Sequence, residues 1–123
     1  MTLKELYASI GGDYDQALRV LRVEKLINKH ICKLEKNGLF DGLREAGESM
    51  DETELFEKSH AIKGVCGNLG LTELASRASE ISDEFRPGSE RNFTDEQVKE
   101  KLQQIDDLYQ KTKDGIREYE ASK

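Results

Sequence analysis

Apolar residues recur every three or four positions in four stretches of this chain of 123 residues. That spacing gathers them on one face of an α-helix, which is then buried against neighbouring helices. The repeating sets are Val23, Ile27, Ile31 and Leu34 over residues 23–37; Leu55, Ile62, Cys66 and Leu69, with Ser59 in the same stripe, over residues 52–69; Leu74, Ala78, Ile81 and Phe85 over residues 71–86; and Val98, Leu102, Ile105, Tyr109, Thr112, Ile116 and Tyr119 from residue 95 onward. No run alternates apolar and polar residues long enough to form a strand. The sequence therefore predicts an all-α fold, an antiparallel four-helix bundle.

Glycine, proline and capping residues mark the ends of these helices. Gly11-Gly12 ends a short additional N-terminal helix, and Asn37-Gly38, Gly70 and Pro87-Gly88 end three of the main ones. Thr94 and Gln97 form a capping-box pattern, and residues 39–49 are expected to add a short helix. Because no repeat or linker is visible, residues 1–123 are predicted to form a single domain.

Composition limits the kinds of partner that the chain is expected to bind. The net charge is −6, and acidic residues interrupt nearly every basic stretch, whereas a nucleic-acid-binding surface needs clustered Lys and Arg. No stretch approaches the roughly 18 apolar residues of a membrane span, and the first residues lack the apolar core of a signal peptide. We therefore expect a cytoplasmic monomer that binds neither nucleic acid nor membrane, with Cys32 and Cys66 not joined in a disulfide. The initial methionine favours a free-standing protein over an excised domain of a larger kinase.

The stretch from His60 to Gly70 carries the candidate chemistry. With about 100° per residue, Lys63, Gly64 and Gly67 fall within roughly 60° of His60, on the side opposite the apolar stripe. Glycine inside a helix costs roughly 0.5–1 kcal/mol relative to alanine, so two exposed glycines call for a reason other than stability. They leave room for the backbone of another protein to approach the imidazole. Tight helix packing is the alternative explanation.

His60 and Lys63 together have the properties of a phosphoryl acceptor. A neutral imidazole is a competent nucleophile near neutral pH. Lys63 lies one turn away and supplies a cation for phosphoryl oxygens. We therefore predict that His60 accepts the phosphoryl group and that Lys63 stabilises it.

The same stretch resembles the central motif of the histidine-containing phosphotransfer (HPt) domains of phosphorelays. The matching positions are His60, Ile62, Lys63-Gly64, Gly67 and Leu69-Gly70. Leu74, Ala78 and Ile81 also follow the family's spacing, and Gly11-Gly12-Asp13-Tyr14 resembles its opening turn. One departure is Ser82-Asp83, near a position where many relatives carry an acidic residue.

The resemblance implies a phosphocarrier with no kinase activity and no cofactor of its own. His60 would accept a phosphoryl group from an aspartyl phosphate on a receiver domain and pass it to another receiver. A hybrid histidine kinase is a further possible partner. Gly64 and Gly67 would meet the receiver, and Phe56 is the candidate for an apolar docking contact, with an ordinary core residue as its alternative.

Three other interpretations stay open beside this one. Glu57 and His60 match half of a di-metal helical site, although the only other histidine, His30, lacks the matching glutamate. His30 itself is expected to be half-buried beside Leu26. The serious functional alternative is a non-catalytic binding module that docks on a response regulator and sequesters it.

Overall fold

The computed structural model describes residues 1–122, and this part of the chain is helical without any strand. The all-α prediction is therefore confirmed. In chain order the elements are α1 (Leu3–Ile10), α2 (Tyr14–Leu21), α3 (Glu24–Cys32), the 3-10 turn η1 (Leu34–Asn37), α4 (Leu39–Ser49), α5 (Glu52–Asn68), α6 (Thr72–Phe85) and α7 (Asp95–Ala121). Within residues 1–122, no helix combines the length and apolar character that a membrane span requires.

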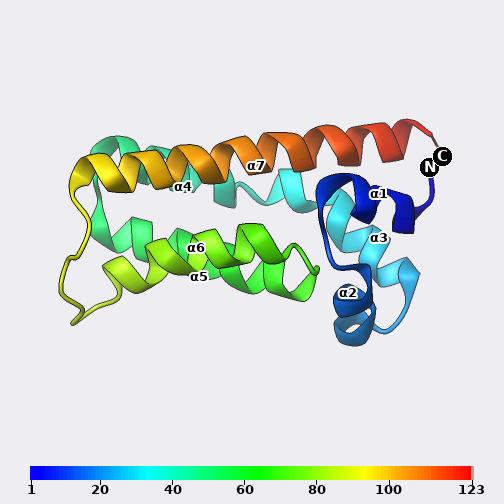
Figure 1. Ribbon diagram of the computed structural model, residues 1–123, viewed down its shortest axis with the longest axis horizontal. Coiled ribbons are helices and arrows are strands. Elements are labelled where there is room, and N and C mark those ends of the chain that lie inside the picture. Colours follow the sequence, from blue (N-terminus) through cyan, green and yellow to red (C-terminus); the bar gives the residue numbers. More distant parts are fainter. Residues whose placement is uncertain (123) are drawn as a thin grey trace.

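Helices α4 to α7 form the bundle. The most extensive contact is between α5 and α6; α5 also packs on α4, and α7 packs on both α4 and α6. Short turns join α4 to α5 and α5 to α6, so neighbouring helices run in opposite directions (Figure 1). The short helix expected over residues 39–49 is present, and it is a member of the bundle in place of the helix predicted over residues 23–37.

Helix α7 extends from the bundle to the N-terminal helices. It has 27 residues, which corresponds to about 40 Å of helix. Beyond the bundle it continues along α1, and α1, α2 and α3 gather at that end (Figure 1). The capping box predicted at its start is present, since Thr94 and Gln97 each accept the other's backbone N–H.

The N-terminal third differs from the prediction in two respects. The helix expected over residues 23–37 is divided into α3 and η1, and Val23 is half exposed because it precedes α3 in an extended conformation. Helix α2 was not predicted at all. The Asp13 side chain caps it by accepting the Gln16 backbone N–H at 3.0 Å, a polar pair three residues apart that does signal a helix start.

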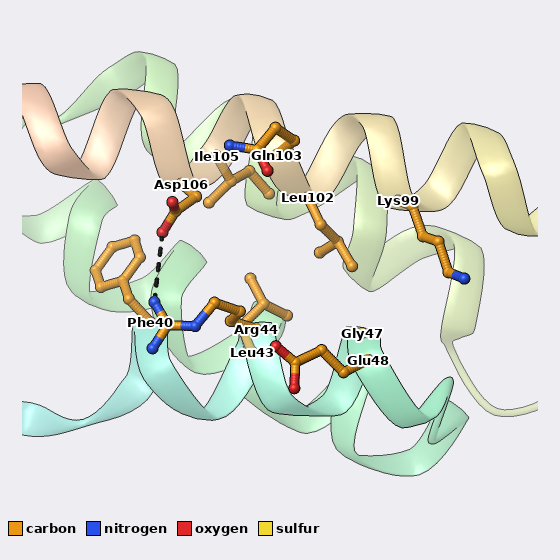
Figure 2. A pocket seen from close by; sticks show the side chains of 10 residues that line it. All are labelled: Phe40, Leu43, Arg44, Gly47, Glu48, Lys99, Leu102, Gln103, Ile105 and Asp106. Carbon is orange, nitrogen blue, oxygen red and sulfur yellow. Dashed lines mark ion pairs between the residues drawn. The ribbon is translucent and has the colours of Figure 1, made fainter.

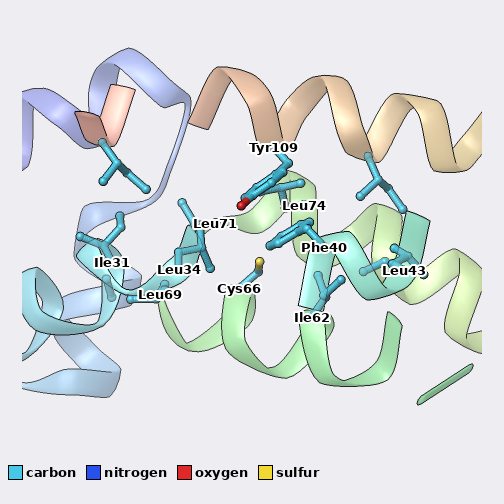
Figure 3. Close-up of a cluster of buried hydrophobic side chains, with 14 of the residues drawn as sticks. Ile31, Leu34, Phe40, Leu43, Ile62, Cys66, Leu69, Leu71, Leu74 and Tyr109 are labelled. Carbon is cyan, nitrogen blue, oxygen red and sulfur yellow. The ribbon is translucent and has the colours of Figure 1, made fainter. Parts of the chain in front are cut away.

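The interior is built from the predicted apolar faces. Ile62 and Cys66 of α5 point into it, toward Phe40 of α4 and Tyr109 of α7 (Figure 3). The rings of Phe40 and Tyr109 stack with their centroids 4.0 Å apart. Burial of one side of α5 determines which of its residues face solvent.

The C-terminal end of α5 is held by the N-terminal helices. The Tyr7 hydroxyl of α1 donates a buried hydrogen bond of 2.6 Å to the Leu69 carbonyl. The Asp13 backbone N–H donates to the Gly70 carbonyl at 2.7 Å. Gly70 has φ +70°, and a Cβ there would lie 2.2 Å from the Asp13 carbonyl oxygen, so only glycine fits this turn. These contacts fix the end of the helix that carries the candidate site.

Candidate functional site

The candidate site lies on the outer face of α5. His60 is exposed, and Phe56 and Lys63, one turn to either side, are partly exposed. The opposite face is completely buried through Leu55, Ser59, Ile62 and Cys66. The Ser59 hydroxyl is satisfied there, because it donates to the Leu55 carbonyl at 2.6 Å. The structure thus brings the predicted residues together on one exposed face.

Phe56 contacts both the core and His60. Its ring stacks on the imidazole, with centroids 5.4 Å apart and planes inclined by 20°. The same ring packs against the buried cluster and is only partly exposed. Stacking of this kind restricts the orientation of the imidazole. Phe56 is therefore positioned to orient His60 and also presents an apolar edge beside it.

Gly64 and Gly67 lie next to open space. A Cβ placed on either residue would meet no atom within 4 Å. Other helical glycines of this chain are different: at Gly47 a Cβ would lie 2.5 Å from Leu102, and at Gly115 it would lie 2.6 Å from Ile10. Helix packing explains those two residues but does not explain Gly64 or Gly67. Clearance above α5 is the property that these two glycines provide.

Lys63 is a cation available beside His60. It is partly buried on α5, three residues beyond the histidine, and within residues 1–122 it forms no ion pair. A lysine with a flexible stem and no carboxylate partner is able to turn its ammonium group toward an incoming anion. The exposed face thus combines an imidazole, a cation and free space.

Ser82 and Asp83, where the sequence departs from the motif that it resembles, lie on α6. Ser82 is buried, and its hydroxyl has no hydrogen-bond partner among the described residues. Asp83 is exposed and forms an ion pair of 2.7 Å with Arg86. An acidic side chain is therefore present on this surface, one residue beyond the buried serine.

The structure gives no support to a metal site. Among residues 1–122, no group of three or more His, Cys, Asp or Glu side chains comes close enough to hold an ion. Cys66 is buried, and burial raises the pKa of its thiol to about 12, so the thiolate that a metal binds is disfavoured. Glu57 and His60 face solvent rather than the interior of the bundle.

A cleft of about 450 Å³ lies between α4 and α7 (Figure 2). Its floor is apolar and includes Leu43 and Leu102, and Arg44 bridges to Asp106 across it at 3.8 Å. None of the predicted site residues lines this cleft. It is therefore separate from the face that carries His60.

A second hollow, of about 360 Å³, opens between α3 and the C-terminal half of α5, and no pattern in the sequence predicts it. His30 and Lys33 line it from the α3 side, and Val65 and Asn68 line it from α5. The expectation that His30 is half-buried is wrong. It is exposed because the fully buried residues of α3 are Ile27 and Ile31, and His30 lies to one side of them.

Comparison with protein-family models places a known family on most of this chain. The model of the Hpt domain matches residues 29–114, a range that contains α4, α5 and α6 completely. Comparison with curated proteins and with solved structures finds no match. The match includes the whole stretch from His60 to Gly70 and leaves α1 and α2 outside.

Proposed function

Because the Hpt model matches more than half of its length, the chain belongs to the Hpt domain family, and we propose that His60 is the residue that carries the phosphoryl group. Domains of this family transfer phosphoryl groups through a histidine in phosphorelays. The proposal for this chain is a carrier between two receiver domains, without kinase activity of its own. The observation that carries it is the exposed His60 beside two glycines above which the space is open.

The bonds that form and break in the proposed reaction involve only the histidine and the aspartyl phosphate of the receiver. A lone pair on the His60 imidazole, on Nε2 by resemblance to the family, attacks the phosphorus of the aspartyl phosphate. The P–N bond forms as the bond from phosphorus to the aspartyl oxygen breaks, and the aspartate leaves as a carboxylate. The proton on the other ring nitrogen stays on the imidazole. In the second transfer an aspartate oxygen of another receiver attacks the same phosphorus and the P–N bond breaks.

The neighbours of His60 have distinct parts in this proposal. Stacking on Phe56 limits how far the ring rotates, so the attacking nitrogen is directed outward. Lys63 places positive charge near the phosphoryl oxygens, whose negative charge spreads during transfer. Gly64 and Gly67 let the receiver backbone come close enough for in-line attack. These roles are compatible with a site completed by its partner.

The test is transfer from phosphorylated receivers to the full chain. Each receiver domain encoded by the source organism is phosphorylated with labelled acetyl phosphate and mixed with the wild type or with His60→Gln. We expect label on the wild type that is lost in acid and kept in base, as a phosphoramidate requires, and none on the variant.

Two results would contradict the proposal. Label on His60→Gln would place the acceptor elsewhere. Saturable binding of a phosphorylated receiver without transfer to the wild type would favour the sequestering module instead. Circular dichroism of the variant shows whether the helices are retained.

A further inference from the structure

The cleft between α4 and α7 has the size and the lining of a site for a small molecule. Its volume of about 450 Å³ lies within the roughly 300–1,000 Å³ of ligand pockets in proteins. Leu43, Leu102 and Ile105 make its apolar part, and charged side chains surround them (Figure 2). None of the residues proposed for phosphoryl transfer lines it. An occupant of this cleft would therefore be distinct from the receiver that meets His60.

The packing of α4 against α7 determines which residues face each other across the cleft. A Cβ on Gly47 would lie 2.5 Å from Leu102, and Arg44 contacts Asp106 at 3.8 Å. Residue numbers thus fall along α4 as they rise along α7, so the two helices run in opposite directions. The pair of Arg44 and Asp106 bridges one end of the cleft, and the other end lies beyond Gly47 and Leu102.

Two charges of opposite sign line that other end, one from each helix. Glu48 directly follows Gly47 on α4. Lys99 lies three residues before Leu102, or about one turn of α7. Within residues 1–122 neither Glu48 nor Lys99 forms an ion pair, whereas the Arg44 guanidinium is already paired. This end of the cleft therefore offers a free carboxylate and a free ammonium group.

The balance of charge indicates the kind of ligand that fits. The charged residues of the lining are two cations and two carboxylates, Arg44, Lys99, Glu48 and Asp106. A balanced lining gives no preference for a simple anion or cation, whereas a zwitterion satisfies both free groups at once. Lys99 and Asp106 are seven residues apart on α7, or about 10 Å of helix. The apolar floor between them has room for one bulky side chain.

We propose that this cleft binds a free α-amino acid with a bulky apolar side chain, such as phenylalanine. The α-ammonium group of the ligand contacts Glu48, and its carboxylate contacts Lys99. The side chain lies along the apolar floor, between Leu43 and Leu102. Such a ligand joins α4 to α7 and stabilises the folded bundle by its binding free energy. The inference adds a binding site to the protein and does not depend on the carrier function.

The test is titration of the full chain, labelled with ¹⁵N, with three related compounds followed by NMR. Phenylalanine should give saturable shifts of the Gly47 and Leu102 amides, with a Kd on the order of 1 mM. Phenethylamine lacks the carboxylate and 3-phenylpropanoate lacks the ammonium group. Each should bind about three- to fivefold more weakly, which is the effect of losing one exposed ion pair.

Two variants assign each charge of the ligand to its partner. Glu48→Gln should weaken phenylalanine and phenethylamine by about three- to fivefold and leave 3-phenylpropanoate nearly unchanged. Lys99→Gln should weaken phenylalanine and 3-phenylpropanoate and leave phenethylamine nearly unchanged. Glu45→Gln and Lys111→Gln are the matched controls, because both residues are exposed on the same two helices and neither lines the cleft. The controls should bind all three compounds as the wild type does.

Three results would overturn the inference. The first is the absence of saturable shifts with phenylalanine up to its solubility limit, and the second is shifts centred on residues outside the cleft. The third is equal binding of the three compounds, or equal binding by Glu48→Gln, Lys99→Gln and the controls, which would show that the cleft does not recognise the charges. None of these results bears on phosphoryl transfer, which the comparison of the wild type with His60→Gln tests by itself.

Discussion

At the scale of single residues, the properties of His60 come from its neighbours. Four buried residues on the opposite face of α5 turn the imidazole outward, and the Phe56 ring restrains it from one side. The two nearby glycines leave its other side open. A reactive, accessible histidine thus requires both a well-buried face and a poorly covered one on the same helix.

Gly64 is expected to lower the stability of the fold while leaving room for the receiver to approach His60. Because a Cβ at this position meets nothing, Gly64→Ala is expected to raise the free energy of unfolding by roughly 0.5–1 kcal/mol. Gly64→Gln should remain folded yet transfer on the order of tenfold more slowly, because its side chain fills the space that the receiver needs. Thermal unfolding and single-turnover transfer test the two effects together. A lower melting temperature for Gly64→Ala, or full transfer by Gly64→Gln, would refute the argument from clearance.

Lys63 should act on the rate of transfer and not on docking. Lys63→Met removes the cation and keeps most of the stem, so we expect the maximal rate to fall on the order of tenfold. The half-saturating receiver concentration should stay nearly constant. Lys63→Arg keeps the charge and should recover much of the rate. If Lys63→Met instead raised the half-saturating concentration alone, Lys63 would be a docking residue.

At the scale of secondary-structure elements, a buried carboxylate organises the link from α6 to α7. Glu84 has a side chain that is 1% exposed, and it accepts the backbone N–H groups of Asn92 and Phe93 at 2.8 and 2.7 Å. Arg91 pairs with it at 3.1 Å and also contacts Glu52 and Asp95. One acidic residue near the end of α6 therefore holds the loop, the start of α7 and, through Arg91, the start of α5.

The link that Glu84 forms between α6 and α7 should weaken at acidic pH. Burial by itself raises the pKa of Glu84, but the hydrogen bonds from Phe93, Arg91 and Asn92 outweigh burial and hold the pKa below its usual value. A lowered pKa contributes stability above the unfolded-state value of about 4.3, and that contribution is lost as pH falls through the folded-state pKa. Glu84→Gln should therefore cost roughly 2–3 kcal/mol at pH 7 and less near pH 3. Urea unfolding of both proteins at the two pH values measures the difference, and an equal cost at both would contradict it.

Three of the bundle helices, α5, α6 and α7, were predictable because each carries a long apolar period and a clear start or end, whereas α4 was expected only as a short additional helix. Residues 52–69 show both, and α5 begins and ends within a residue of that range. The N-terminal third was harder because its helices are short. Helix α2 buries only Ala17 completely, and its apolar repeat of Tyr14, Leu18 and Leu21 spans only eight residues, so the repeat was too short to predict the helix by itself. The pair of Asp13 and Gln16 was the other local signal. The division after Cys32 depends on packing at the end of the bundle, which no local pattern encodes.

The candidate site likewise has one part that the sequence predicts and another part that it does not. The face of α5 with His60, Lys63 and both glycines follows from helical spacing alone, because one helix carries all four residues. The stacking of Phe56 on the imidazole depends on rotamers and was not predicted. The hollow beside it combines α2, α3, η1 and α5, and residues so far apart in sequence come together only in the folded chain.

At the scale of the whole molecule, α1 to α3 act as a cap on one end of the bundle. Tyr7 binds the Leu69 carbonyl, and the segment before α2 contacts Gly70 through the Asp13 backbone. The cap therefore supports the turn that follows α5, and it contributes one wall of the hollow described above. Contacts of the N-terminal segment and the placement of the site helix are physically linked.

Gly70→Ala should disrupt the contact between the cap and the turn that follows α5. Gly11→Ala is the control that separates the cost of a positive φ from the cost of the clash with Asp13. Both glycines have φ +70°, which costs alanine about 1–2 kcal/mol. At Gly11 a Cβ meets nothing, whereas at Gly70 it lies 2.2 Å from the Asp13 carbonyl oxygen, so the backbone of the cap must move. We expect Gly11→Ala to cost only the conformational part and Gly70→Ala to cost roughly 2–3 kcal/mol, with faster hydrogen exchange in α2 and at the end of α5. Equal losses of unfolding free energy in the two variants would mean that the cap does not support the turn.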